Sequence, residues 1–130
     1  MRKIGVVMDI LGLGIDIVDI KRMKKTLSGK AGARFIENTF TKNEIACASC
    51  ENISKFATSF AAKEAVYKAF GTGWIEGKDV EVLRSKEEGT PSIRLHGEIE
   101  KIAKKRKIKK VLVSLSFTEE NAIAVAILCK

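Results

Sequence analysis

The sequence is poor in residues that often build catalytic or metal sites. Its 130 residues include one histidine, three cysteines and one proline. A Ser-His-Asp triad depends on histidine, and the single His96 ends a predicted strand, so we expect His96 to be structural or exposed. Cys47 and Cys50 form a C-x-x-C pair, but no second pair of zinc ligands accompanies them. We therefore expect reduced thiols, as in a cytosolic protein.

Long apolar runs and the common nucleotide-binding loops are also absent from the sequence. No apolar run approaches the roughly 20 residues that a membrane-spanning helix needs. The apolar stretch within residues 1–8 is too short for a secretory signal, so we expect a cytoplasmic protein with no membrane partner. Neither a G-x-x-x-x-G-K-[ST] loop nor a G-x-G-x-x-G loop after a strand occurs, so the usual phosphate cradles are excluded.

Positive charge, by contrast, is abundant, and the net charge is +8. Seven lysines and arginines and no acid lie in Lys101–Lys110, and a second basic cluster lies in 21–25. Clustered positive charge favours an anionic partner, such as nucleic acid, a phosphate ligand or an acidic protein. Lys101–Lys110 fits a solvated helix face and turn equally well, so its charge leaves both interpretations open.

The spacing of apolar residues predicts helices mostly in the first half and hairpins in the second. We expect a buried strand over Ile10–Val18 and a long helix over Lys55–Gly73 that Gly71 ends, with Phe56, Phe60 and Tyr67 facing a core. Further helices are expected over 19–27, 31–38, 42–50 and 97–105, and further strands over 80–84, 92–96, 111–117 and 122–128. Thr41-Lys-Asn-Glu44 is a capping-box pattern that opens the helix over 42–50. Because strands and helices do not alternate, we predict a single-domain α+β fold with an antiparallel sheet.

Carboxylates and lysines are the remaining candidates for chemistry. Asp16 lies within an apolar strand, where a carboxylate is costly unless it is paired, hydrogen-bonded to backbone amides or bound to a cation. Glu64 and Lys68 lie four residues apart on the long helix, and form either a surface ion pair or part of a site. If the strand packs on the helix, Asp16 and Glu64 meet, and two carboxylates with room for water suit Mg²⁺. Lys68 would face a phosphate bound there, which fits phosphoryl transfer.

Two stretches at this spacing resemble a known family. Gly14–Ile20 (GIDIVDI) and Phe60–Gly73 (FAAKEAVYKAFGTG) are together similar to the holo-[acyl-carrier-protein] synthases, the small 4′-phosphopantetheinyl transferases. The resemblance continues through Gly89-Thr-Pro91, Leu95-His-Gly97 and Val113–Ser116. It implies a 4′-phosphopantetheinyl transferase-like fold, with the sheet packed on the long helix, in one domain over residues 1–130. The resemblance begins near Met8, so residues 1–7 are expected to be an N-terminal extension or an upstream start.

The resemblance also implies a reaction in fatty acid biosynthesis. The 4′-phosphopantetheine arm of coenzyme A would move to a serine of apo acyl carrier protein, with release of adenosine 3′,5′-bisphosphate. Asp16 and Glu64 would bind Mg²⁺, and Lys68 would stabilise charge on the phosphates. The serine proton would pass to Glu64 or to a metal-bound water. The glycine loop Gly71-Thr72-Gly73 would shape the coenzyme A pocket.

Partners follow from the same resemblance. Lys21 and Arg22 would meet the acidic carrier protein, and the assembly would be a homotrimer with sites between subunits. Two positions depart from many relatives: Ser59 stands where a basic residue is common, and Phe117 where histidine is common. Lys55, one turn before Ser59, is a candidate to compensate.

Two alternatives stand beside the transferase interpretation. The first is a non-catalytic nucleic-acid-binding module that uses Lys101–Lys110. Aromatic residues make up only 6% of the chain, which leaves few side chains for stacking on bases, and we expect no nucleic-acid partner. The second is a family member that has lost activity through Ser59 and Phe117.

Overall fold

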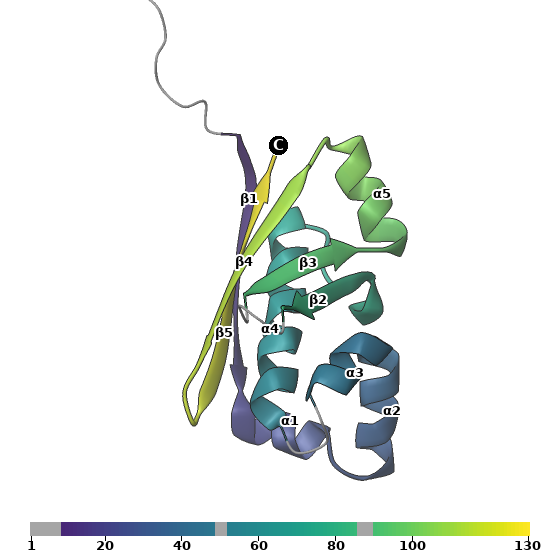
Figure 1. The fold of residues 1–130 in the computed structure, drawn as a ribbon, viewed down its shortest axis with the longest axis vertical. Helices are drawn as coiled ribbons and strands as arrows, with labels where there is room; N and C mark the ends of the chain where they lie inside the picture. The colour runs from purple at the N-terminus through teal and green to yellow at the C-terminus, as the bar shows by residue number, and fades with distance from the viewer. Residues whose placement is uncertain (1–8, 49–51, 86–89) are drawn as a thin grey trace, which may run out of the picture.

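The computed structural model describes residues 9–48, 52–85 and 90–130, shown as a ribbon in Figure 1. Its helices and strands are, in chain order, β1 (Ile10–Asp19), α1 (Ile20–Thr26), α2 (Gly29–Thr39), α3 (Lys42–Ala48), α4 (Ile53–Phe70), β2 (Val80–Arg84), β3 (Pro91–Leu95), α5 (Gly97–Lys105), β4 (Lys110–Phe117) and β5 (Asn121–Cys129), with a short 3₁₀ turn over 77–79. The predicted α+β fold is confirmed. None of the described helices is long and apolar enough to cross a membrane.

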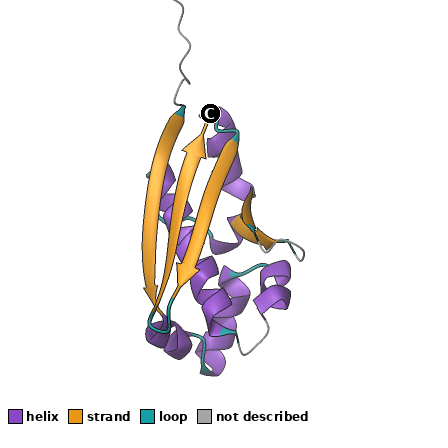
Figure 2. Ribbon diagram, turned by 60° about the vertical axis from the view of Figure 1, so that its left-hand side comes forward, coloured by secondary structure: helices purple, strands orange, loops and turns teal. Residues whose placement is uncertain are grey.

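Helix α4 lies between two layers of the molecule (Figure 1). On one side is an antiparallel sheet of order β1-β5-β4, and on the other are the β2–β3 hairpin and α3. Figure 2 shows the three long strands side by side, with the helices on one side of them. Three of the four fully buried side chains of β5 are alanines, Ala122, Ala124 and Ala126, and the fourth is Leu128. Small side chains let the sheet lie close to the helix.

The contact between β1 and α4 is closer still because two glycines face the helix. A Cβ atom at Gly12 would overlap the carbonyl oxygen of Ala69, and one at Gly14 would overlap that of Ala65. The close backbone approach predicted for these glycines is therefore confirmed. Because side chains alternate along a strand, Asp16 projects to the same side as Gly14, toward α4.

The prediction that β1 is buried is wrong for half of its residues. Leu13, Ile15 and Ile17 are 60–67% exposed in this chain. The physical reason is that the helices cover only one face of the sheet, and the glycines occupy that face. The large aliphatic side chains consequently project from the other face.

The ends of α4 follow local chemistry. The side chain of Asn52 accepts a hydrogen bond from Lys55 N, so the helix begins two residues before the predicted start. Gly71 ends it with a positive φ of 75°, as predicted. Phe56 and Tyr67 are buried and Phe60 is partly buried, which confirms the predicted core face.

Other boundaries shift by a few residues, for similar local reasons. Asp19 accepts a hydrogen bond from Arg22 N and caps α1, which starts at Ile20. β3 ends at Leu95, because His96 is the N-cap residue of α5. The predicted end of α3 at Cys50 lies outside the described residues.

Candidate active site

Asp16 and Lys68 form an ion pair that joins β1 to α4. Lys68 Nζ lies 2.9 Å from Asp16 Oδ1 and also donates a hydrogen bond to the carbonyl oxygen of Ile15, at 3.1 Å. The Asp16 side chain is 15% exposed, whereas that of Lys68 is 54% exposed. The sequence paired Lys68 with Glu64, whereas in the structure Lys68 bonds to Asp16. The ammonium group therefore holds the strand carboxylate and still reaches solvent.

Glu64 lies one turn before Lys68 on α4 and shares a cavity with Asp16. Burial raises the pKa of Glu64, the negative charge of Asp16 raises it further, and Lys68 opposes both effects. The two carboxylates are thus close enough to repel each other. The structure brings together all three residues that the sequence singled out for chemistry.

The cavity that holds both carboxylates has a volume of about 350 Å³. Its wall includes Asp16, Asp19, Arg22, Phe35, Phe60 and Glu64. Oxygen ligands from two facing carboxylates suit Mg²⁺, which commonly takes its remaining ligands from water and substrate phosphates. No group of three or more His, Cys, Asp or Glu that could hold a metal occurs within the described residues. Asp16 and Glu64 supply two carboxylates in one cavity, which fits a magnesium ion that takes its other ligands from water and a phosphate ligand.

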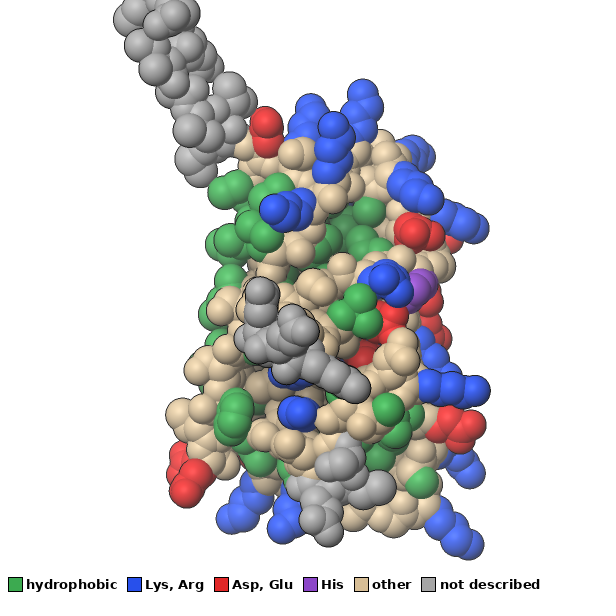
Figure 3. All heavy atoms as spheres, viewed as in Figure 1, with side chains coloured by type: hydrophobic (Ala, Val, Ile, Leu, Met, Phe, Trp, Pro, Cys, Tyr) green, Lys and Arg blue, Asp and Glu red, His purple; other side chains and the backbone are tan. Residues whose placement is uncertain are grey.

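The basic residues of α1 adjoin this cavity. Lys21 and Arg22 are exposed and line a groove over α1, together with Lys24 and Lys25. Arg22 also lines the carboxylate cavity. In the view of Figure 3, lysines and arginines gather around α1 at the lower end of the molecule, and around α5 and the start of β4 at the upper end. A negatively charged partner on α1 would thus lie beside the two carboxylates.

The glycine loop Gly71-Thr72-Gly73 follows α4 directly. Gly71 and Gly73 both have φ of 75°, and an added Cβ at either would meet no other atom within 4 Å. Trp74 then packs its ring on Phe60 and Tyr67, with centroid distances of 5.4 and 5.5 Å. Phe60 also lines the carboxylate cavity, so it contacts both the cavity and the Trp74 ring.

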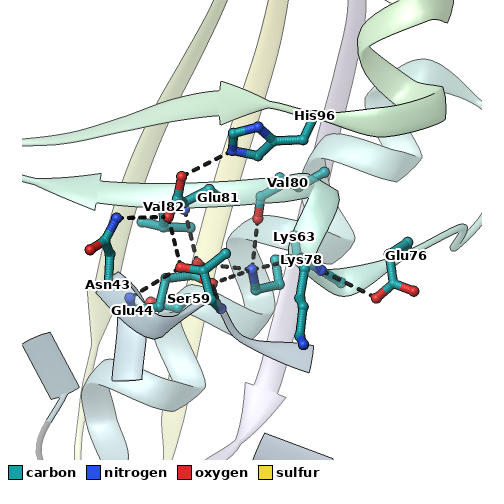
Figure 4. A network of polar contacts seen from close by, with 12 residues as sticks. Asn43, Glu44, Ser59, Lys63, Glu76, Lys78, Val80, Glu81, Val82 and His96 are labelled. Carbon is teal, nitrogen blue, oxygen red and sulfur yellow. Dashed lines mark hydrogen bonds and ion pairs between the residues drawn. The ribbon is translucent and has the colours of Figure 1, made fainter. Parts of the chain in front are cut away.

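Sequence reasoning missed a buried ion pair next to Glu64. Lys63 is fully buried, and its Nζ donates hydrogen bonds to both carboxylate oxygens of Glu44 at 2.8 Å (Figure 4). The Nζ also donates to the carbonyl oxygens of Gly77 and Val80, at 2.8 and 2.7 Å. Burial lowers the pKa of Lys63, and Glu44 opposes this effect. The signal for it in the sequence is helical spacing, since Lys63 follows Phe60 by three residues on the predicted core face.

Glu44 has a second role that the sequence did indicate. Its carboxylate accepts a hydrogen bond from Thr41 N, and the Thr41 hydroxyl accepts one from Glu44 N. This is the predicted capping box at the start of α3. Glu44 also accepts from Val82 N at 2.9 Å. The same side chain therefore joins the helix cap, α4 and β2.

Glu81 forms a second polar cluster beside this pair (Figure 4). Its carboxylate accepts hydrogen bonds from the Thr41 hydroxyl at 2.7 Å and from Asn43 at 3.4 Å, and lies 3.0 Å from His96 Nε2. Burial raises the pKa of Glu81, but the bonds from Thr41, His96 and Asn43 hold it below its usual value overall. His96 is thus structural and partly exposed, as the sequence predicted.

The two departures from family pattern lie near the start of α4. Arg84 Nη2 donates to the hydroxyls of Thr58 and Ser59, at 2.9 and 3.1 Å. A guanidinium group from β2 therefore stands beside Ser59. Lys55 instead donates to the carbonyl oxygen of Cys47, and lines with Arg84 and Phe117 a cavity of about 230 Å³.

Part of the basic segment Lys101–Lys110 serves the fold. Arg106 donates a hydrogen bond to the carbonyl oxygen of Phe70 at 2.9 Å, and its guanidinium lies 5.5 Å from the centroid of the Phe70 ring. Lys104, Lys105 and Lys107 are exposed. The segment thus combines one structural contact with a solvated surface.

Comparisons with known proteins agree with this site. Residues 12–126 match the model of the 4′-phosphopantetheinyl transferase superfamily. The holo-[acyl-carrier-protein] synthase of Natranaerobius thermophilus is 40% identical over 123 residues, covering 92% of this chain and 97% of that protein. The crystal structure of the Neisseria meningitidis holo-[acyl-carrier-protein] synthase has a TM-score of 0.82 at 28% identity, covering 93% of this chain and 99% of its own. The crystal structure of the Helicobacter pylori enzyme in complex with coenzyme A has a TM-score of 0.79 at 28% identity, covering 89% of this chain and 98% of its own.

Proposed function

Since the chain belongs to the holo-[acyl-carrier-protein] synthases of the 4′-phosphopantetheinyl transferase superfamily, we propose that its reaction takes place in the cavity between β1 and α4. The enzyme transfers phosphopantetheine from coenzyme A to acyl carrier protein. The observation that carries this placement is the meeting of Asp16 and Glu64 in one cavity, with Lys68 bonded to Asp16. The family match supports one phosphopantetheinyl transferase domain. A cytoplasmic location stays a prediction from the sequence.

Asp16 and Glu64 are the residues that would hold Mg²⁺. Each carboxylate raises the cost of charge on the other, and a divalent cation between them would remove that cost. When bound, the ion supplies positive charge to the diphosphate of coenzyme A. Lys68 bonds to Oδ1 of Asp16, and Oδ2 would be the oxygen presented to the ion.

In the transfer itself, the carrier serine oxygen attacks the phosphorus that carries the pantetheine arm. The new O–P bond replaces the bond from that phosphorus to adenosine 3′,5′-bisphosphate, which leaves. The serine proton would pass to Glu64, which lines the cavity, or to a metal-bound water. The half-exposed Lys68 is positioned to offset the charge on the leaving phosphate.

The carrier protein would dock on α1. Lys21 and Arg22 present positive charge to an acidic partner, and Arg22 reaches from that surface into the carboxylate cavity. Docking there would bring a serine of the partner to the cavity mouth. The glycine loop Gly71-Thr72-Gly73, on the other side of Phe60, would bind coenzyme A.

The outer sheet face supports a homotrimer with sites between subunits. The exposed apolar side chains on β1, β4 and β5 include Leu13, Ile15, Ile17, Leu112, Phe117 and Ile123. An apolar surface of this kind is rare on a monomer and fits an interface with other copies of the chain. We expect light scattering to give three times the chain mass for the wild type and a smaller mass for Ile15→Lys, but not for Lys101→Glu on the exposed face of α5. A monomeric wild type at micromolar concentration would contradict this assembly.

The transfer is tested by mass spectrometry of the carrier protein. With coenzyme A and Mg²⁺, the wild type should add one phosphopantetheine to apo carrier protein. Asp16→Ala and Glu64→Ala should abolish the addition. Asp9→Ala, which removes an exposed carboxylate just before β1, should not. Full activity of either cavity variant would remove that residue from the metal site.

A further inference from the structure

Tyr67 closes both ends of the loop that follows α4. Its backbone carbonyl accepts a hydrogen bond from Gly71 N at 2.9 Å, where the helix ends. Its hydroxyl donates to the carbonyl oxygen of Glu76 at 2.6 Å and accepts from Glu76 N at 3.1 Å. The intervening residues 71–75 thus span two points that are fixed on one residue.

Lys63, one turn earlier on α4, fixes the chain just beyond that loop. Its Nζ donates to the carbonyl oxygens of Gly77 and Val80 (Figure 4). On the opposite side Gly77 touches α2, since a Cβ there would lie 2.6 Å from the carbonyl oxygen of Thr39. Residues 76–80 are therefore hydrogen-bonded to α4 through their backbone and packed against α2 at Gly77.

The loop between these anchors has little packing of its own. Gly71 and Gly73 have positive φ and open space where a side chain would be, and the Thr72 hydroxyl bonds only within the loop, to Gly73 O. Trp74 packs back on Phe60 and Tyr67 of α4 and is 40% exposed. The shape of the loop thus depends on its anchors.

We propose that Tyr67 and Lys63 are positioning residues that hold loop 71–75 in the shape that binds coenzyme A. The inference rests on the proposed coenzyme A role of Gly71-Thr72-Gly73. A loop ordered before binding loses less conformational entropy when the ligand arrives. Loss of an anchor should therefore weaken coenzyme A binding and leave the transfer step unchanged, which raises KM and not kcat.

Tyr67→Phe tests this, because it removes one oxygen atom and keeps the ring under Trp74. We expect KM for coenzyme A to rise by about 2- to 10-fold, as the loss of the two partly buried hydrogen bonds to Glu76 allows, with kcat within about 2-fold of the wild type. Trp74 is the only tryptophan, so its fluorescence reports on the loop in the free enzyme. Acrylamide should quench Trp74 more strongly in the variant.

Two further variants distinguish the positioning role of Tyr67 from the coenzyme A role of the loop. Ile99→Val removes one methylene group from the buried core, leaves every hydrogen bond of the anchors in place, and should leave both KM and quenching at wild-type values. The inference would be overturned if Ile99→Val raised KM as much as Tyr67→Phe does, or if Tyr67→Phe left KM unchanged. Gly73→Ala strains the loop directly, because φ is positive there. If Gly73→Ala raises KM and Tyr67→Phe does not, the coenzyme A role of the loop stands and the positioning role fails. If neither raises KM, both fail.

Discussion

Lys63 and Glu64 are neighbours in the sequence and have opposite environments in the fold. Lys63 is fully buried, and its Nζ has four oxygen acceptors within 2.8 Å. Glu64 lines an open cavity, and its pKa is raised by burial and by a second carboxylate. A charge that serves the fold is matched by opposite charge and hydrogen bonds, whereas Glu64 faces the like charge of Asp16, which Lys68 does not fully offset. We infer function from the second pattern and stability from the first.

The largest expected effect follows from removing the charge of Glu64. Glu64→Gln should lower kcat by about 10²- to 10⁴-fold, because it removes a proton acceptor and a metal ligand. Stability should not fall. The raised pKa means that the stabilising contribution of Glu64 is complete below its ordinary pKa of 4.5 and is lost as pH rises through the raised value.

Thermal unfolding at pH 7 without metal checks this stability claim. The Gln variant should unfold at the wild-type temperature or above it, and added Mg²⁺ should stabilise the wild type only. A variant that is clearly less stable than the wild type would place Glu64 among the residues that hold the fold.

The next largest effect follows from removing the buried charge of Lys63. Lys63→Met should cost about 3–5 kcal/mol of unfolding free energy, because it leaves the buried Glu44 carboxylate without its partner. Lys68→Met on the same helix is the matched control and should cost at most about 1 kcal/mol, since that lysine is half exposed. Urea unfolding of both variants gives the two values, and equal costs would contradict the distinction.

The smallest effect follows from replacing His96, which lies at the edge of the buried polar cluster around Glu81. His96→Gln should cost about 0.5–1.5 kcal/mol, because His96 is partly exposed and makes one bond to Glu81. The lowered pKa of Glu81 gives stability above the ordinary glutamate pKa that is lost as pH falls through the lowered value. Without His96 that loss should begin at higher pH. Acid unfolding curves that coincide would remove His96 from this role.

The sequence predicted the parts of the fold that depend on local patterns. The end of α4 at Gly71, the capping box of Thr41 and Glu44 and the close approach of Gly12 are local signals, and all three are confirmed. The meeting of Asp16 with Glu64 also followed, because packing the strand on the helix left few alternatives.

What the sequence did not predict depends on which surfaces are covered. β1 has the composition of a buried strand, but whether helices cover one face or both is decided by the rest of the chain. Lys63 has the composition of a surface lysine, and its acceptors come from α3, Gly77 and β2, which no helical pattern places together. Likewise, Arg84 reaches Ser59 from a strand 25 residues away.

The pKa of Glu64 tests the central claim most directly, measured by carbon NMR of its carboxyl group with and without Mg²⁺. Without metal, the pKa should lie above its ordinary value of 4.5, because of burial and the charge of Asp16. With Mg²⁺ it should fall, because the ion favours the ionised carboxylate, and Asp16→Asn should abolish the response to the metal. A pKa that Mg²⁺ leaves unchanged, in an enzyme that still needs Mg²⁺ for transfer, would contradict metal binding by Asp16 and Glu64.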